Sequence, residues 1–185
     1  MIELLNEFAQ AADKADAHAG WLKREFGLPD AVVKPNGRAV FGVGHCTFNT
    51  DGTYQPTEDG EKALIIAEAQ SHERWKHSGK VGIAEVIDLI AVPFNARERW
   101  FLRRGMACLL GAENLEDASD NNPITVYATP LRWLQAGGDG LCIVNWESFD
   151  RWYFAQTFPL QFETTELAQR FFVRTQFQKK TMVNA

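Results

Sequence analysis

The stretch PITVYATPLRWLQAGGDGLCIVNW, residues 123–146, carries the strongest fold signal in this chain. Ile124 to Ala128 is rich in β-branched and aromatic residues, as strands are, and Thr129 followed by Pro130 is a typical helix start. Gly137-Gly138 ends the helix, and the apolar run LCIV that follows is typical of a strand buried on both faces. The connection is just long enough for a crossover between parallel neighbours, so we predict a β-α-β unit here.

The residues before this unit predict one long helix and a sheet. Apolar residues recur at intervals of three and four across residues 2–26, which predicts an amphipathic helix that ends at Gly27. Between residues 31 and 94, apolar runs alternate with turn signals, and Pro35-Asn36-Gly37 predicts a hairpin. Residues 62–69 and 81–92 should be the best buried strands. Their links are too short for helical crossovers, so the sheet should be mostly antiparallel.

Further signals complete an α+β fold. A second apolar stripe predicts a helix over residues 96–110 that ends at Gly111. After the β-α-β unit we expect a helix over 149–158, a short strand over 160–162 and a last helix capped by Thr164. We therefore predict a single domain, 1–185, with three parts: an N-terminal helix (2–26), an antiparallel sheet (31–94), and a helix with the β-α-β portion (96–178).

Composition limits the classes of function. Hydrophobic residues make up 45% of the chain, enough for a real core, and the net charge of −5 excludes a basic field over the whole surface. The three cysteines are an odd number in apolar runs, which indicates free thiols in a reducing compartment. No apolar segment reaches membrane-spanning length, and the N-terminus lacks the basic and apolar regions of a signal peptide. We expect a cytoplasmic protein without membrane contact.

Motifs for metals and cofactors are not found in the sequence. The histidines and cysteines lie at none of the spacings that zinc sites use. Gly42-Val43-Gly44 lacks the third glycine of a dinucleotide fingerprint, and the glycines at 137–140 lack the Lys-Ser/Thr of a phosphate loop. The sequence therefore predicts neither a metal nor a cofactor.

The strongest candidate for a binding surface lies on the helix predicted over residues 96–110. At 100° per residue, its cationic side chains and one tryptophan would share an arc of about 160°: Arg97, Arg99, Trp100, Arg103 and Arg104. Such a face could bind an acidic protein or a nucleic acid. The alternative is that these arginines pair internally with the carboxylates of the following loop, residues 113–120.

Two carboxylates inside apolar strands provide an alternative, catalytic hypothesis. Asp88 interrupts the run Val86–Ile90, and Glu68 ends the run Leu64–Ala67. A buried carboxylate is costly unless it is paired or functional, so either residue, or a histidine, could serve as an acid or base in a site assembled only by the fold. The structural alternative is a solvent-facing strand or a carboxylate satisfied by hydrogen bonds.

Residues 86–111, VIDLIAVPFNARERWFLRRGMACLLG, and residues 124–146 resemble uncharacterised small proteins encoded in bacterial prophages and mobile elements. The resemblance covers about a third of the chain. It implies no activity, but it favours a nucleic acid, a replication factor or a host defence protein as the target. From these observations we expect a non-catalytic binding protein that contacts an anionic partner through the Arg/Trp face. A homodimer built on the N-terminal helix is compatible with either function.

Overall fold

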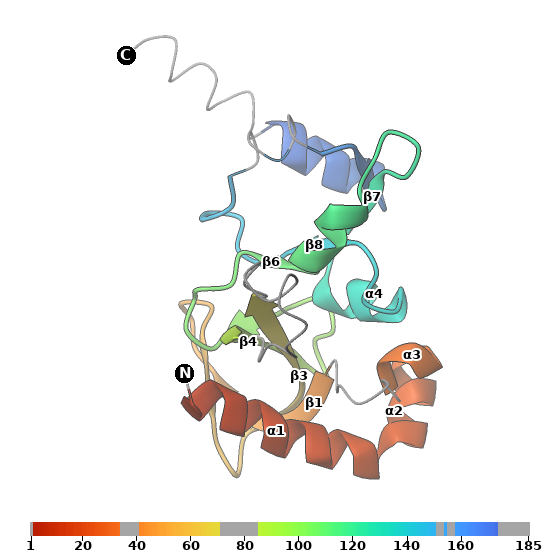
Figure 1. Cartoon of the computed structure of the whole chain (residues 1–185). Coiled ribbons are helices and arrows are strands. Elements are labelled where there is room, and N and C mark those ends of the chain that lie inside the picture. Colours follow the sequence, from red (N-terminus) through yellow and green to blue (C-terminus); the bar gives the residue numbers. More distant parts are fainter. Residues whose placement is uncertain (1, 34–40, 71–84, 151–153, 155–157, 174–185) are drawn as a thin grey trace, which may run out of the picture.

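The computed structural model describes residues 2–33, 41–70, 85–150, 154 and 158–173. Two sheets lie one above the other, and helices cover the first sheet on both sides (Figure 1). The elements of the first half are α1 (Ile2–Ala17), α2 (Ala19–Phe26), α3 (Asp30–Val33), β1 (Phe41–Phe48), β2 (Tyr54–Pro56), β3 (Glu61–Gln70) and β4 (Glu85–Pro93). Those of the second half are β5 (Phe101–Leu102), β6 (Leu109–Leu110), the 3-10 helix η2 (Ala112–Asp117), β7 (Ile124–Tyr127), α4 (Pro130–Gln135), β8 (Leu141–Ile143) and β9 (Leu160–Phe162).

The first sheet has the strand order β2-β1-β3-β4-β5, and every neighbouring pair is antiparallel. Its central strands are buried on both faces: Ala63 and Ile65 of β3 pack in the cluster formed with α1, whereas Leu64 and Ile66 pack in the cluster that contains α2 and α4. Double burial explains why β3 is a continuous apolar run and not an alternating one. The mostly antiparallel sheet predicted from the sequence is confirmed.

The N-terminal helical segment is two helices instead of one. α1 packs on one face of the sheet through Leu4 and Ala11, and the chain then breaks at His18. α2 places Leu22 and Phe26 in the cluster on the opposite face before Gly27 ends it in the left-handed conformation. A single straight helix could not cover both faces of a sheet, which accounts for the break.

The beginning of the predicted sheet also differs from the prediction. Residues 30–33 form α3, so the strand expected over residues 31–34 is wrong. The hairpin predicted at Pro35-Asn36-Gly37 lies outside the described residues. Gly42 fixes the contact between α1 and β1, because a Cβ atom there would lie 2.4 Å from the backbone carbonyl carbon of Ala11. Only glycine allows the helix to lie this close to the strand.

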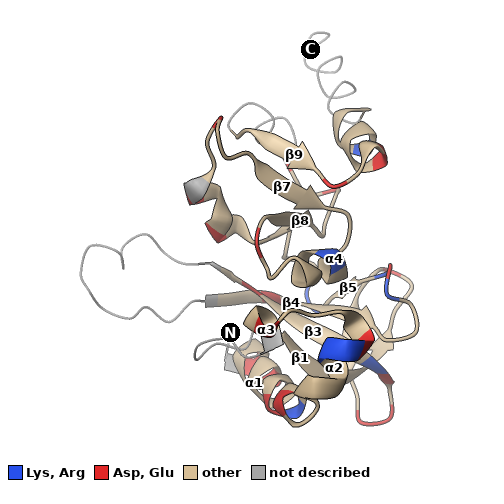
Figure 2. Cartoon of the chain, turned by 90° about the vertical axis from the view of Figure 1, so that its right-hand side faces the viewer, with Lys and Arg blue, Asp and Glu red and all other residues tan. Residues whose placement is uncertain are grey.

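The β-α-β unit forms as predicted and builds the second sheet, which has the order β6-β8-β7-β9. β7 and β8 are parallel, and α4 connects them. Thr129 caps α4 by accepting a hydrogen bond of 3.2 Å from the backbone N–H of Arg132, and Pro130 occupies the first turn. α4 lies between the two sheets in both views of the chain (Figures 1 and 2). Its residues Leu131 and Leu134 join the core of the first sheet.

The helix predicted over residues 96–110 is wrong. Turns follow β4, and Phe101–Leu102 then pairs with β4 as the edge strand β5. Residues 103–108 cross to the second sheet, where Leu109–Leu110 pairs with β8 as β6. Of the apolar residues that suggested a helical stripe, Phe101 and Leu102 are buried in β5 and Leu109 is buried in β6, whereas Met106 lies between the two strands and is exposed.

The C-terminal elements agree with the sequence where they are described. β9 pairs in parallel with β7, and a helix over residues 165–173 begins after Thr164, whose side chain accepts a hydrogen bond of 3.1 Å from the N–H of Leu167. Most of the helix predicted over residues 149–158 lies outside the described residues. None of the helices in the described ranges combines the length and the apolar character needed to cross a bilayer.

Candidate functional site

The five residues of the predicted Arg/Trp face do not share a face in the structure. Arg97 forms an ion pair with Glu25 of α2, and its guanidinium lies 4.4 Å from the ring centroid of Phe26. The indole of Trp100 is half-buried and donates a hydrogen bond of 2.8 Å to the carbonyl oxygen of Val144. These two side chains are therefore engaged inside the molecule.

The next two arginines of the predicted face pair with α1. The side chain of Arg103 is mostly buried; its Nε lies 3.0 Å from Oε2 of Glu7, and its Nη2 lies 3.2 Å from Oε1 of Glu3. The Nη2 atom of Arg104 lies 3.2 Å from Oε2 of Glu3. Internal pairing was the alternative considered from the sequence, but the expected partners were the carboxylates of residues 113–120. The partners are instead the acids of the N-terminal helices, which are distant in sequence.

Arg99 is the exception among these residues. It is exposed, its guanidinium lies 5.2 Å from the ring of Phe101, and it forms no ion pair with any described residue. A single exposed arginine beside an engaged tryptophan does not make a cationic surface. A binding role for Arg99 stays a prediction.

Asp88, the carboxylate inside an apolar strand, is fully buried and fully satisfied. Its Oδ1 accepts hydrogen bonds from the N–H groups of Leu89 and Arg104, and its Oδ2 accepts from those of Met106 and Ala107, at distances of 2.6 to 3.0 Å. The sequence alternative of a satisfied carboxylate is therefore confirmed. Asp88 organises the crossing from β5 to β6, and it has no oxygen left for chemistry.

Glu68 is the cross-strand neighbour of Asp88, and its surroundings are different. The side chain is 7% exposed and forms no hydrogen bond or ion pair with the described residues. Burial, with the negative charges of Glu113 and Asp88, raises the pKa of Glu68 to about 8. The structure thus brings the two predicted carboxylates together, but only Glu68 is available to a ligand.

Glu68 lines a cavity of about 500 Å³ at the junction of the two sheets. The cavity walls are mostly apolar and include Ile87, Met106 and Phe149, and the Cys108 thiol also faces it. Burial and the charge of Glu68 raise the pKa of Cys108, so this thiol is not an activated nucleophile. The cavity offers one unpartnered carboxyl group in an apolar enclosure.

A second cavity, of about 240 Å³, lies where α1 and α2 meet the sheet edge at β1. We call it the α2 groove, and we define it by its lining residues: Lys14, His18, Trp21, Leu22, Val43, His45, Lys62 and Phe94. No acidic residue is among them. Trp21 is 44% exposed, and its ring lies 5.7 Å from that of Phe94. The ammonium groups of Lys14 and Lys62 form no ion pair within the described ranges.

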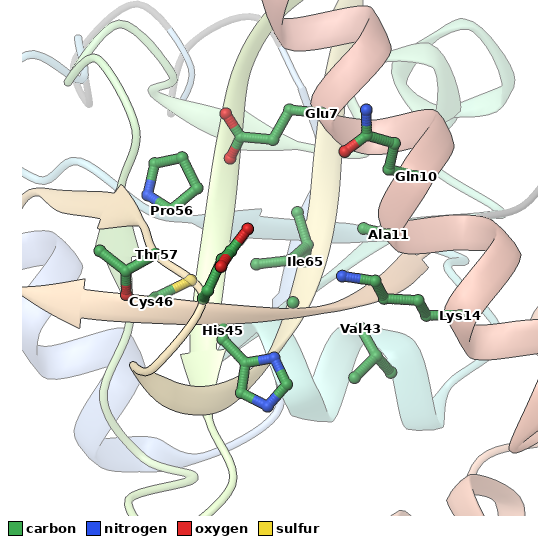
Figure 3. Close-up of a pocket in the computed structure, with 12 residues that line it drawn as sticks. Glu7, Gln10, Ala11, Lys14, Val43, His45, Cys46, Pro56, Thr57 and Ile65 are labelled. Carbon is green, nitrogen blue, oxygen red and sulfur yellow. The ribbon is translucent and has the colours of Figure 1, made fainter.

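The α2 groove continues into a more polar cavity of about 380 Å³, drawn in Figure 3. Lys14 and His45 line both. On its far side, Glu7 accepts a hydrogen bond of 2.9 Å from the Tyr54 hydroxyl, and burial raises the pKa of Cys46 to about 12. This part of the cavity is a satisfied structural network, so it does not compete with the α2 groove for the role of ligand site.

The α2 groove is not visible in the sequence, because its residues come from separate segments of the chain. One signal was present: Trp21 lies outside the apolar stripe of residues 2–26, which predicts an exposed indole on the helix. Lys62 and Phe94 reach the same place only through the antiparallel pairing of β3 with β4. No local pattern could have shown that convergence.

Comparisons with protein families, with curated proteins and with solved structures find no match to this chain.

Proposed function

We propose that this chain is a non-catalytic binding protein that captures an anionic partner in the α2 groove. The observation that supports this most is the position of Lys14 and Lys62 beside an exposed indole. Neither ammonium group pairs with a described acid, and none of the described residues lining the cavity is a carboxylate. The proposal keeps the anionic partner expected from the sequence. It moves the contact surface away from the arginines, since Arg97, Arg103 and Arg104 are already paired internally.

The groove favours an anion that carries an apolar or aromatic body. Trp21, Leu22 and Phe94 offer a largely apolar floor on which a ring can pack. The two lysines at its edge can then form charge-assisted hydrogen bonds with a carboxylate, sulfonate or phosphate. Aromatic stacking beside cationic side chains is also the way in which proteins hold unpaired nucleotides, so a nucleic acid and an acidic protein with aromatic residues share this chemistry.

The setting of the protein is part of the same proposal. The resemblance to proteins of prophages and mobile elements favours a nucleic acid, a replication factor or a host defence protein as the partner. A cytoplasmic location is supported by three free cysteines, of which Cys46 and Cys142 are buried. The homodimer stays an untested alternative, and the apolar face of α1 is already used against the sheet.

Two fluorescent probes of nearly the same shape test the groove directly. 8-Anilinonaphthalene-1-sulfonate carries a negative charge, and N-phenyl-1-naphthylamine is its uncharged counterpart. The double variant Lys14→Met/Lys62→Met should bind the sulfonate about twofold to thirtyfold more weakly, from the usual strength of two exposed ion contacts, and should bind the neutral probe unchanged. Trp21→Ala should weaken both probes, because it removes the shared apolar floor.

Lys23→Met is the matched control, since Lys23 lies on α2 but pairs with Asp30 at 2.6 Å. It should leave both affinities unchanged. If the wild type and the double lysine variant bind the sulfonate equally well, the assignment of the α2 groove as the anion-binding site is refuted. Competition by a single-stranded oligonucleotide and by an acidic, aromatic peptide then separates the two partner classes, and the oligonucleotide should lose affinity steeply with added salt.

A further inference from the structure

The cavity that contains Glu68 is independent of the α2 groove. It lies on the face of the first sheet that is turned towards β6, because Glu68 follows Leu64 and Ile66 at two-residue intervals on β3. The register of β3 against β4 shifts directly after Glu68, at a β-bulge between Glu68 and Ala69, and pairing then continues to Gln70 and Glu85. The carboxyl group of Glu68 lies at the wall of the cavity, next to this irregularity in the sheet.

Two carboxylates and one thiol interact electrostatically with this carboxyl group from three neighbouring elements. Asp88 faces it from β4, Glu113 from η2, and the Cys108 thiol from the segment before β6. Asp150 lines the same cavity. Among the described residues that line the cavity there is no lysine, arginine or histidine. The carboxyl group of Glu68 therefore meets acidic groups and no basic side chain among the described residues that line the cavity.

We propose that this cavity binds a small organic cation, an amine or quaternary ammonium group with an apolar body. Ionised Glu68 would form the ion pair, and Ile87, Met106 and Phe149 would enclose the apolar part. An aromatic ring such as that of Phe149 also attracts an ammonium group through its face. A metal ion fits less well, because no three His, Cys, Asp or Glu side chains of the described chain converge in ligating positions.

Binding of the cation should release a proton from Glu68. At pH 7 a carboxyl group with a pKa of about 8 is protonated in about nine molecules out of ten. Binding of the cation requires the ionised form, so about 0.9 proton per cation should pass from Glu68 to the buffer. As the pH is raised towards 8, the observed affinity for the cation should increase about tenfold per pH unit, and above pH 8 it should level off.

Benzylammonium is a suitable probe, and benzyl alcohol is its neutral counterpart of similar shape. Titration calorimetry in two buffers with different ionisation enthalpies measures the proton released on binding. The wild type should bind benzylammonium with proton release and should bind benzyl alcohol at least tenfold more weakly. Glu68→Gln should abolish both the proton release and the pH dependence. Glu166→Gln, an exposed carboxylate on the helix over residues 165–173, should change neither.

Alkylation of Cys108 gives a readout that does not depend on a variant. Cys46 and Cys142 are buried, whereas Cys108 is partly exposed and lines the cavity, so benzylammonium should slow its reaction with iodoacetamide. The proposal is overturned if the wild type binds no benzylammonium at millimolar concentrations. It is also overturned if the cation binds without proton release, or if it leaves the alkylation rate of Cys108 unchanged.

Discussion

Replacing Asp88 with asparagine should cost far more stability than replacing its neighbour Glu68 with glutamine. Both substitutions exchange a buried carboxyl group for an amide of the same shape, and the two positions face each other across β3 and β4. They differ in what the oxygens do. Asp88 accepts four backbone N–H groups, whereas Glu68 accepts none from the described residues.

The size of the effect follows from this difference. Asparagine keeps one oxygen, which can serve one pair of N–H donors, and its NH₂ group then faces the other pair. Two buried N–H groups lose their acceptor, at about 1–3 kcal/mol each, which gives a loss of about 2–6 kcal/mol. Because a domain of this kind has a free energy of unfolding of only about 5–15 kcal/mol, Asp88→Asn should be barely stable.

Urea unfolding followed by circular dichroism measures both free energies of unfolding, and tryptophan fluorescence provides a second probe. At neutral pH we expect Asp88→Asn to lose at least about 2 kcal/mol and Glu68→Gln to lose nothing, or to gain. Similar losses for both variants would refute the assignment of the four hydrogen bonds to Asp88. Asp88→Asn should also loosen residues 104–107, which hydrogen exchange can detect through faster exchange at their amides.

Two further predictions concern Glu68 and Gly42. The folded state holds a proton on Glu68 up to a pKa of about 8, whereas the unfolded chain releases it near 4.5, so the free energy of unfolding should fall as pH rises through this window. The free energy of unfolding of Glu68→Gln, minus that of the wild type, should therefore increase by up to about 1.4 kcal/mol per pH unit between about pH 5 and pH 8. Urea unfolding at several pH values measures this difference, and a difference that does not change with pH would contradict the raised pKa of Glu68. Gly42→Ala should cost about 1–3 kcal/mol or more in a thermal melt, because the new methyl group would meet the backbone of Ala11. Gly20→Ala on α2, with only a flexible Arg24 atom within 4 Å, is its control and should stabilise slightly, and equal melting temperatures for the two variants would contradict the close packing of α1.

Local signals in the sequence were sufficient for the β-α-β unit. The cap at Thr129, the proline after it and the glycine pair at residues 137 and 138 each act over one turn, and each is in place. The same holds for Gly27, which ends α2, and for Thr164, which caps the last helix. These features depend on neighbours in sequence, so reasoning from neighbours recovered them.

Residues 96–110 show where that reasoning stops. Their apolar spacing suits a helix, but Asp88 binds the N–H groups of Arg104, Met106 and Ala107, and the open edge of β4 accepts β5. Both influences are non-local, and together they override helix propensity. The sequence did identify Asp88 as an unusual residue. It could not show that this residue determines the conformation of a segment some 15–20 positions further along the chain.

The candidate sites also divide into features that depend on neighbours in sequence and features that depend on distant residues. Glu68 and Asp88 were recognised because a carboxylate within an apolar run is visible in one dimension, and the structure makes them neighbours. The ion pairs of Arg103 and Arg104 with α1 span about a hundred residues, so no spacing rule could predict them. The α2 groove was missed for the same reason.

The order of the elements has a consequence for synthesis on the ribosome. All strands of the first sheet come from residues 41–102 and pair as antiparallel neighbours, so this sheet can assemble while later residues are still being translated. The second sheet needs β9, at residues 160–162, beside β7. A nascent chain that pauses between these points would have a paired first sheet, but the edge of β7 that later binds β9 would still be open. At this stage we expect the chain to depend most on chaperones.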